Sequence, residues 1–246
     1  MMFNWTPAMI RFMEDASEYG TYFREVCSEL YPYISKESTV CDAGCGLGHS
    51  SIELAKYAGK VVACDINKNA LSVLKQNCEK YHIENVDIVC KDINDLVTEK
   101  PFDAMLFCMY GEFPEDLQIA KRLCSGKILI VTRNQLNHSF SPGGGKHAKP
   151  NYAEAVAFCK ENDIPFISKE TEIEFGQPIR SIEDACLFFK TYLRDGDEDL
   201  LTEDFVKSRL VENDDDIFPW YIPKKRPLGF LIIDTKDIPD SVEHSA

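Results

Sequence analysis

The feature that most constrains this chain is the alternation of short apolar runs with amphipathic helical segments over its first half. Five apolar runs have the length of strands: 39–43, 61–65, 86–90, 102–108 and 127–132. Three segments between them repeat apolar residues three and four positions apart, as helices do: 49–57, 68–81 and 115–124. This alternation is typical of a mostly parallel sheet with helices on both faces, so we expect a doubly wound α/β fold.

The segments on either side predict how the chain is divided. Two helical patterns, around residues 9–16 and 22–30, precede the first strand, and we expect residues 1–38 to form an N-terminal helical extension. Residues 39–246 would form the main domain, with a glycine-rich loop at 134–150 and a last strand at 228–234. Helical patterns at 182–193 and 203–211 interrupt it. We interpret about 177–226 as a helical cap insertion, because so short a segment holds a poor core alone.

Charge and cysteine content limit the class of protein. The formal net charge is -14, and residues 195–216 carry ten acids against two bases. A surface that tracks phosphates needs lysine and arginine, so a nucleic-acid partner is disfavoured. The acidic stretch fits a solvated face or a docking surface for a basic partner. The ten cysteines are scattered singly, and no long apolar run occurs, so we expect a cytoplasmic protein without a membrane span.

The most informative motif is the glycine turn at 40–48, Val-Cys-Asp-Ala-Gly-Cys-Gly-Leu-Gly, between the first strand and its helix. Glycine allows a tight turn and a close ligand, and the helix N-terminus favours an anionic group. A dinucleotide site typically has the spacing GxGxxG, whereas this turn has GxGxG. Asp42, just before the first glycine, would repel a pyrophosphate but could pair with the ammonium of an amino-acid moiety.

Two further acids follow the next two strands. Asp65 could accept hydrogen bonds from both ribose hydroxyls, and Asp92 could accept the adenine amino group while Ile93 packs on the ring. Each also has a simpler interpretation, because aspartate commonly caps helices. Asp65 could cap the helix that starts near Lys68, and Asp92 could cap a short helix through Leu96.

With these three motifs in this order, the chain resembles the class I S-adenosylmethionine-dependent methyltransferases. The run 102–108 also resembles the strand before that family's reaction site. The resemblance implies seven strands in the order 3-2-1-4-5-7-6, the last antiparallel, with 228–234 in that role. It also implies S-adenosyl-L-methionine as methyl donor. The cofactor-binding residues it implies are Asp42, Ala43, Gly44, Gly46, Gly48, Asp65, Ile66, Asp92, Ile93 and Cys108.

The catalytic candidates lie at the end of the fourth strand and in the glycine-rich loop. Tyr110 could orient an acceptor, and Glu112 could take a proton or bind an ammonium. His138 or His147 could act as a base or as a metal ligand. We expect no metal ion. The acceptor is expected to be a small molecule, with a protein side chain as the second choice. Two other functions stay open: a non-catalytic nucleotide-binding or scaffold protein of the same fold, and an NAD-dependent oxidoreductase.

Overall fold

A computed structural model describes residues 4–134, 140–143 and 152–240, and the chain divides into two compact units. The large unit comprises residues 23–134, 149–171 and 227–246. The small unit comprises residues 1–22, 135–148 and 172–226. Each is described by itself below.

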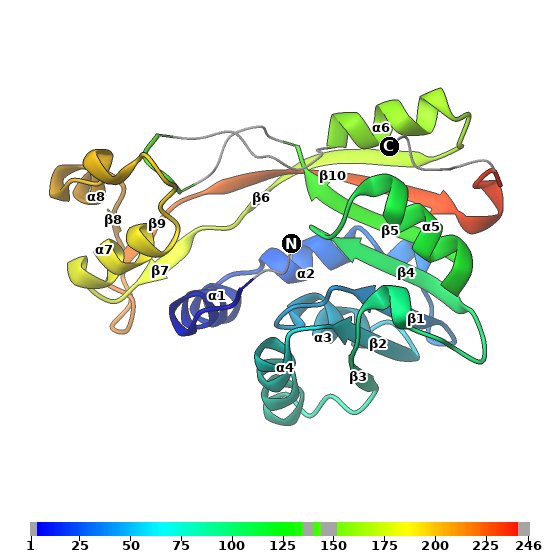
Figure 1. Ribbon diagram of the computed structural model, residues 1–246. Coiled ribbons are helices and arrows are strands. Elements are labelled where there is room, and N and C mark those ends of the chain that lie inside the picture. The colour runs from blue at the N-terminus through cyan, green and yellow to red at the C-terminus, as the bar shows by residue number, and fades with distance from the viewer. Residues whose placement is uncertain (1–3, 135–139, 144–151, 241–246) are drawn as a thin grey trace. The chain divides into compact units, whose positions relative to one another are not determined.

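The large unit is built on a seven-stranded sheet in the order β3-β2-β1-β4-β5-β10-β6 (Figure 1). Its strands are β1 (Thr39–Ala43), β2 (Lys60–Asp65), β3 (Val86–Cys90), β4 (Phe102–Cys108), β5 (Cys124–Arg133), β6 (Ile167–Glu174) and β10 (Lys225–Asp234). The first five pair in parallel, and β10 runs antiparallel to β5, with Leu228 opposite Arg133. Since β10 is the seventh strand of this sheet along the chain, the predicted order 3-2-1-4-5-7-6 is confirmed.

The three helices expected between the strands are present with small shifts at their ends, as α3 (His49–Ala55), α4 (Lys68–Lys80) and α5 (Phe113–Leu123). The other helices of the large unit are α2 (Tyr22–Ser28), whose first residue belongs to the small unit, η1 (Tyr31–Tyr33), η2 (Ile93–Asp95), α6 (Tyr152–Glu161) and η4 (Thr235–Asp237). The Asn67 side chain caps α4 by accepting the N–H groups of Asn69 and Ala70. Among the described residues, no helix has both the length and the apolar character needed to cross a bilayer.

Successive residues of a strand point to opposite sides of the sheet. Apolar residues therefore lie on both faces of this sheet, and helices cover both. On one face, Cys41, Cys64 and Met105 pack in one hydrophobic cluster with residues of α5 and α6. On the other, Ala63 packs with Ile52 of α3 and with residues of α4. Most of these side chains are fully buried, and burial of a large one such as Met105 contributes about 1.5–3 kcal/mol. The strand ends are thereby held in a rigid frame.

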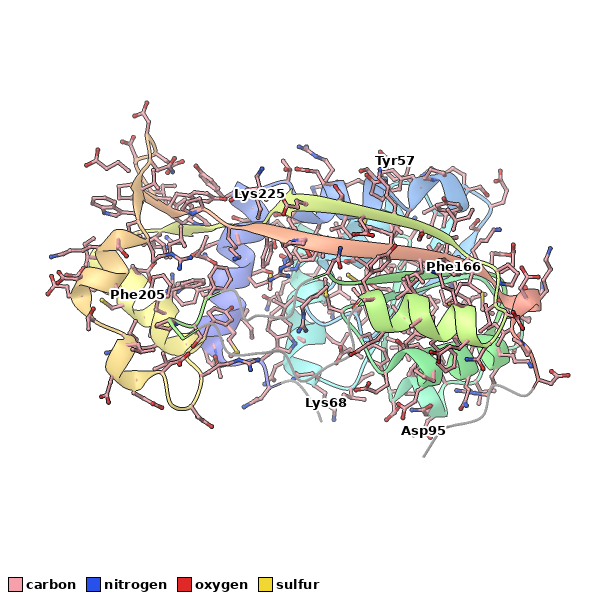
Figure 2. The ribbon with its side chains drawn as sticks, turned by 90° about the horizontal axis from the view of Figure 1, so that it is seen from above. Tyr57, Lys68, Asp95, Phe166, Phe205 and Lys225 are labelled. Carbon is pink, nitrogen blue, oxygen red and sulfur yellow. The ribbon has the colours of Figure 1, made fainter. Side chains whose placement is uncertain are left out.

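The small unit has its own core and a second sheet, in the order β7-β9-β8 (Figure 1). Its elements are α1 (Pro7–Tyr19), β7 (Gln177–Ile179), α7 (Ile182–Thr191), η3 (Glu198–Leu200), α8 (Glu203–Ser208), β8 (Val211–Glu212) and β9 (Trp220–Ile222). Eight buried residues form the core: Phe12, Phe140, Ile179, Ala185, Phe188, Phe189, Val206 and Ile222. Phe205, labelled in Figure 2, packs against them. The two helices expected in the cap are present, but the expectation of a purely helical cap missed this sheet.

Charged pairs tie α1 to the rest of the small unit. Arg11 Nη2 lies 2.5 Å from Asp184 Oδ1 at the start of α7, and Arg180 Nη2 lies 2.5 Å from Asp15 Oδ1. Asp15 is only 8% exposed, so its charge needs these partners.

The two compact units divide the expected N-terminal extension, residues 1–38, after residue 22. The domain boundaries drawn from the sequence stay a prediction.

Candidate functional site

The residues singled out in the sequence meet at one edge of the large sheet. Ala43, Asp65 and Cys108 are the last residues of β1, β2 and β4, and Asp92 follows β3 by two residues. These strands are parallel and in register, with Ala43 opposite both Cys64 and Phe107. Their carboxyl ends therefore share an edge. The strand order reverses between β1 and β4, which is where open α/β sheets bind ligands.

The glycine turn adopts a backbone that other residues rarely take. The φ angles of Gly44, Gly46 and Gly48 are +67°, +56° and +78°. The Gly44 N–H donates to the Cys64 carbonyl at 2.8 Å, which fastens the turn to β2. A Cβ on Gly44 would lie 2.0 Å from the Tyr110 ring. Glycine is thus required at position 44 both by conformation and by close packing.

Asp65 is oriented by the main chain on both sides. Its Oδ2 accepts the Gly46 N–H at 2.9 Å, and its Oδ1 accepts the Asn67 N–H at 2.8 Å. Each carboxylate oxygen keeps a further lone pair for a ligand hydroxyl. The helix that follows is capped by Asn67, so the alternative that Asp65 is its N-cap is wrong. The next side chain, Ile66, is 42% exposed and offers an apolar surface beside the carboxylate.

Asp42 is a buried acid with one neutral hydrogen-bond donor. It is 2% exposed, and its Oδ2 accepts the Ser51 hydroxyl of α3 at 2.6 Å. Burial raises the pKa of Asp42 to about 6, against the lowering effect of the Ser51 hydrogen bond, and the charge of Asp65 raises it further. Near neutral pH the carboxylate is ionised at a cost, so a ligand cation would stabilise it.

Asp92 has the capping geometry that the sequence left as an alternative. Its Oδ1 accepts the Asn94 N–H at 2.9 Å at the start of η2, and the side chain is exposed. Ile93 is 2% exposed and packs in the hydrophobic cluster under α5. Capping leaves room on Asp92 for a ligand donor. The burial of Ile93 leaves Ile66 as the exposed apolar side chain next to the two acids.

The turn after β4 places Tyr110 against the glycine turn. Met109 and Gly111, on either side of it, have φ angles of +55° and +42°. Burial raises the pKa of Tyr110 to about 12, and the charges of Asp92 and other acids add to the effect. The hydroxyl therefore stays protonated at neutral pH and serves as a hydrogen-bond donor.

The other catalytic candidates are less constrained. Glu112 is exposed at the N-cap position of α5, where its side chain makes no capping hydrogen bond. Cys108 is half-buried at the end of β4. His138 and His147 lie outside the described residues. Their roles stay predictions.

Sequence reasoning missed two features of this site. Ser51 is fully buried among apolar residues of α3, a signal that its hydroxyl has a partner inside, and that partner is Asp42. The contact of Tyr110 with Gly44 joins two turns that are far apart in the sequence, so no local sequence pattern predicts it.

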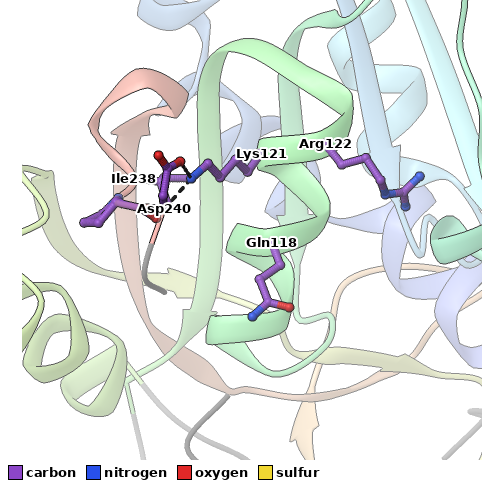
Figure 3. A pocket seen from close by; sticks show the side chains of 6 residues that line it. Gln118, Lys121, Arg122, Ile238 and Asp240 are labelled. Carbon is purple, nitrogen blue, oxygen red and sulfur yellow. Dashed lines mark hydrogen bonds and ion pairs between the residues drawn. The ribbon is translucent and has the colours of Figure 1, made fainter. Parts of the chain in front are cut away.

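A surface hollow of about 290 Å³ lies elsewhere on the large unit (Figure 3). Its lining residues are Gln118, Lys121, Arg122, Ile238, Pro239 and Asp240. Lys121 donates to Asp240 at 2.5 Å and to the Pro239 carbonyl at 3.1 Å, so its charge is already paired. The nearby Thr235 hydroxyl donates to Gly126 in the first part of β5. The hollow thus lies toward the amino end of β5, opposite to the edge that carries the candidate residues.

Comparisons with known proteins show which proteins this chain resembles. The chain is 40% identical over 105 residues to a probable cobalt-precorrin-6B C(15)-methyltransferase (decarboxylating) of Methanobrevibacter smithii, a match that covers 40% of this chain and 55% of that protein. It is 27% identical over 125 residues to the carboxy-S-adenosyl-L-methionine synthase of Shewanella sediminis, covering 46% and 51%. The chain thus spans about half the length of these curated relatives.

Similarity of fold extends over most of the chain. The crystal structure of a putative methyltransferase from Bacillus halodurans superposes with a TM-score of 0.58 at 16% identity, covering 88% of this chain and 99% of that one. A family model described as a methyltransferase domain matches residues 34–163, more than half of the chain. The match includes the glycine turn, Asp65, Asp92 and the turn after β4. The chain therefore belongs to the methyltransferase domain family, among the class I S-adenosylmethionine-dependent methyltransferases.

Proposed function

We propose that this protein transfers the methyl group of S-adenosyl-L-methionine to a small-molecule acceptor. The observation that carries the proposal is the single sheet edge at which Asp42, the left-handed glycines and the oriented Asp65 come together. A relative whose name specifies a precorrin as its substrate supports a small molecule rather than a protein as acceptor.

The residues at this edge fit the chemical groups of the cofactor. The buried charge of Asp42 suits the α-ammonium, and the free lone pairs of Asp65 suit the ribose hydroxyls. Exposed Ile66 suits one face of the adenine ring, and Asp92 suits the adenine amino group. The glycine turn lets the methionine part approach the main chain without a Cβ in the way.

When bound, S-adenosyl-L-methionine would supply an activated methyl group for transfer to the acceptor atom, with the sulfur keeping the electron pair of the broken bond. The protein has to align the acceptor and keep water from its nucleophilic atom. Tyr110 would donate a hydrogen bond to the acceptor, since its hydroxyl stays protonated. Glu112 would take the acceptor's proton where the acceptor carries one of high pKa.

The test is calorimetric titration with S-adenosylhomocysteine, the demethylated cofactor. We expect a stoichiometric site of micromolar strength, about 8 kcal/mol. Asp65→Ala should weaken it at least tenfold, because a ligand hydroxyl loses a charged acceptor. Asp87→Ala, which removes an exposed carboxylate paired with Lys60, is the matched control and should bind like the wild type. The proposal fails if the intact protein binds NADH but not S-adenosylhomocysteine.

A further inference from the structure

Arg226, near the start of β10, is a half-buried guanidinium that no carboxylate neutralises among the described residues. In the same small unit, Arg11 and Arg180 are both paired with aspartates. The one hydrogen bond of Arg226 runs from Nη1 to the Tyr22 hydroxyl at 3.5 Å. In a chain with 41 acids against 27 lysines and arginines, a half-buried arginine without an acid is unexpected. Its remaining donors are available to a ligand.

Aromatic rings hold the guanidinium in place. Arg226 Cζ lies 3.9 Å from the centroid of the Phe175 ring and 5.4 Å from that of Tyr22. The centroids of the two rings are 4.3 Å apart, so the rings contact each other as well as the guanidinium. Tyr22 and Phe175 are themselves buried, at 4% and 9% exposed. The group is thus fixed and partly dehydrated before any ligand arrives, which favours an anion that pairs with its N–H edge.

Tyr192 supplies a second polar group near Arg226. Burial raises the pKa of Tyr192 to about 12, and the opposing charge of Arg226 is close enough to act on it, so Tyr192 adds a protonated hydroxyl nearby. Glu174, next to Phe175 in the chain, is already bonded to the Tyr221 hydroxyl and the Lys224 N–H.

We propose that Arg226, supported by Phe175 and Tyr22, binds the carboxylate group of a small organic acid. A planar guanidinium with its donors in one plane matches the two oxygens of a carboxylate. Arg226 and its aromatic support all belong to the small unit.

The probe for this site is benzoate, titrated into the full-length protein and followed by ligand-observed NMR at constant ionic strength. Benzamide is the neutral counterpart, and inorganic phosphate is the competing anion. We expect benzoate to bind in the millimolar range and benzamide not to compete with it. Arg226→Gln should weaken benzoate at least tenfold. Arg226→Lys keeps the charge but not the fork of donors, so its benzoate affinity should lie between those of the wild type and Arg226→Gln.

Arg209→Gln is the matched control. Arg209 is also half-buried in the small unit and lies over an aromatic ring, with its Cζ 5.7 Å from the centroid of Phe205. It belongs to the acidic stretch 195–216, so its loss should leave benzoate binding unchanged. If Arg226→Gln unfolds the small unit, the backbone NMR spectrum of that variant will show it. Benzoate affinity is then compared between the wild type and Arg226→Lys.

Three results would overturn the inference. If the wild type and both Arg226 variants bound benzoate with equal affinity, Arg226 would not be part of the binding site. Tighter binding of inorganic phosphate than of benzoate would reject the carboxylate. A tenfold loss of S-adenosylhomocysteine affinity in Arg226→Gln would show that Arg226 binds the cofactor instead. Failure of the proposed function looks different: benzoate binding would still depend on Arg226, but the wild type would not bind S-adenosylhomocysteine at all.

Discussion

Neutralising Asp42 should make the folded protein more stable near neutral pH while weakening cofactor binding. The carboxyl group is 2% exposed, and it accepts a hydrogen bond from a neutral hydroxyl, that of Ser51. Its pKa is about 6 in the fold against 3.8 as the ordinary value, chiefly because of burial. Between these two pH values the folded state holds a proton that the unfolded state has lost. The contribution of Asp42 to stability is therefore highest below pH 3.8 and falls as pH rises to 6.

The size of the effect follows from the difference between the two pKa values. A difference of about 2 pH units, at 1.36 kcal/mol each, corresponds to roughly 3 kcal/mol of stability lost by the time Asp42 is fully ionised. About half of this loss should develop between pH 5 and pH 7.5, the range in which the protein can be studied away from extreme acid. Asp42→Asn keeps the size of the side chain and an oxygen that can accept the Ser51 hydroxyl.

The assay is urea denaturation of the wild type and Asp42→Asn at several pH values in this range. The difference in unfolding free energy between them should change by about 1 kcal/mol, in favour of the variant at higher pH. Asp95→Asn, which removes an exposed carboxylate (labelled in Figure 2), is the control for loss of one negative charge. Parallel pH curves for wild type and Asp42→Asn would refute the reasoning. The stabilised variant should also bind S-adenosylhomocysteine more weakly, a trade of stability for function.

Three further substitutions probe other parts of the chain. Gly44→Ala should cost about 2–5 kcal/mol, the sum of a left-handed alanine and a clash with the Tyr110 ring. In urea denaturation, adding Tyr110→Ala should recover only the part of the lost stability that comes from the clash. Full recovery of stability, or none, would contradict this division of the cost. Glu112→Gln should lower turnover about 10² to 10⁴-fold with S-adenosylhomocysteine affinity unchanged; a wild-type rate would clear Glu112 of a catalytic role. Phe188→Ala, at a 1% exposed position, should cost about 3–5 kcal/mol and speed hydrogen exchange within 172–226, whereas equal acceleration in the sheet strands would show that the two units unfold together.

The central strands of the large unit could be predicted closely because they are buried on both faces. Such strands appear as largely apolar runs between polar or glycine-containing turns, and the expected strands at 39–43 and 102–108 match β1 and β4 to the residue. Helix ends were less accurate. The helix expected from residue 115 begins at Phe113, because Pro114 lies in its first turn, where proline is tolerated.

The small unit was harder to predict because its order comes from contacts between distant segments. The strands β7, β8 and β9 contain two or three residues each, too few to show an alternating pattern. The core joins Phe12 of α1, Phe140 and Phe188 of α7, with ring centroids 4.9–5.1 Å apart. Each is an ordinary apolar residue in its local sequence. Only packing shows that they belong together.

The same difference explains why the residues assigned to the cofactor could be predicted and Arg226 could not. The groups assigned to the cofactor follow consecutive strands and act through the main chain, so glycine spacing and three acids encode them locally. Arg226 and Tyr22 are 204 residues apart. Arg226 is distinguished by the lack of a carboxylate partner among the described residues, and no sequence motif indicates such a lack, because it depends on how distant segments pack.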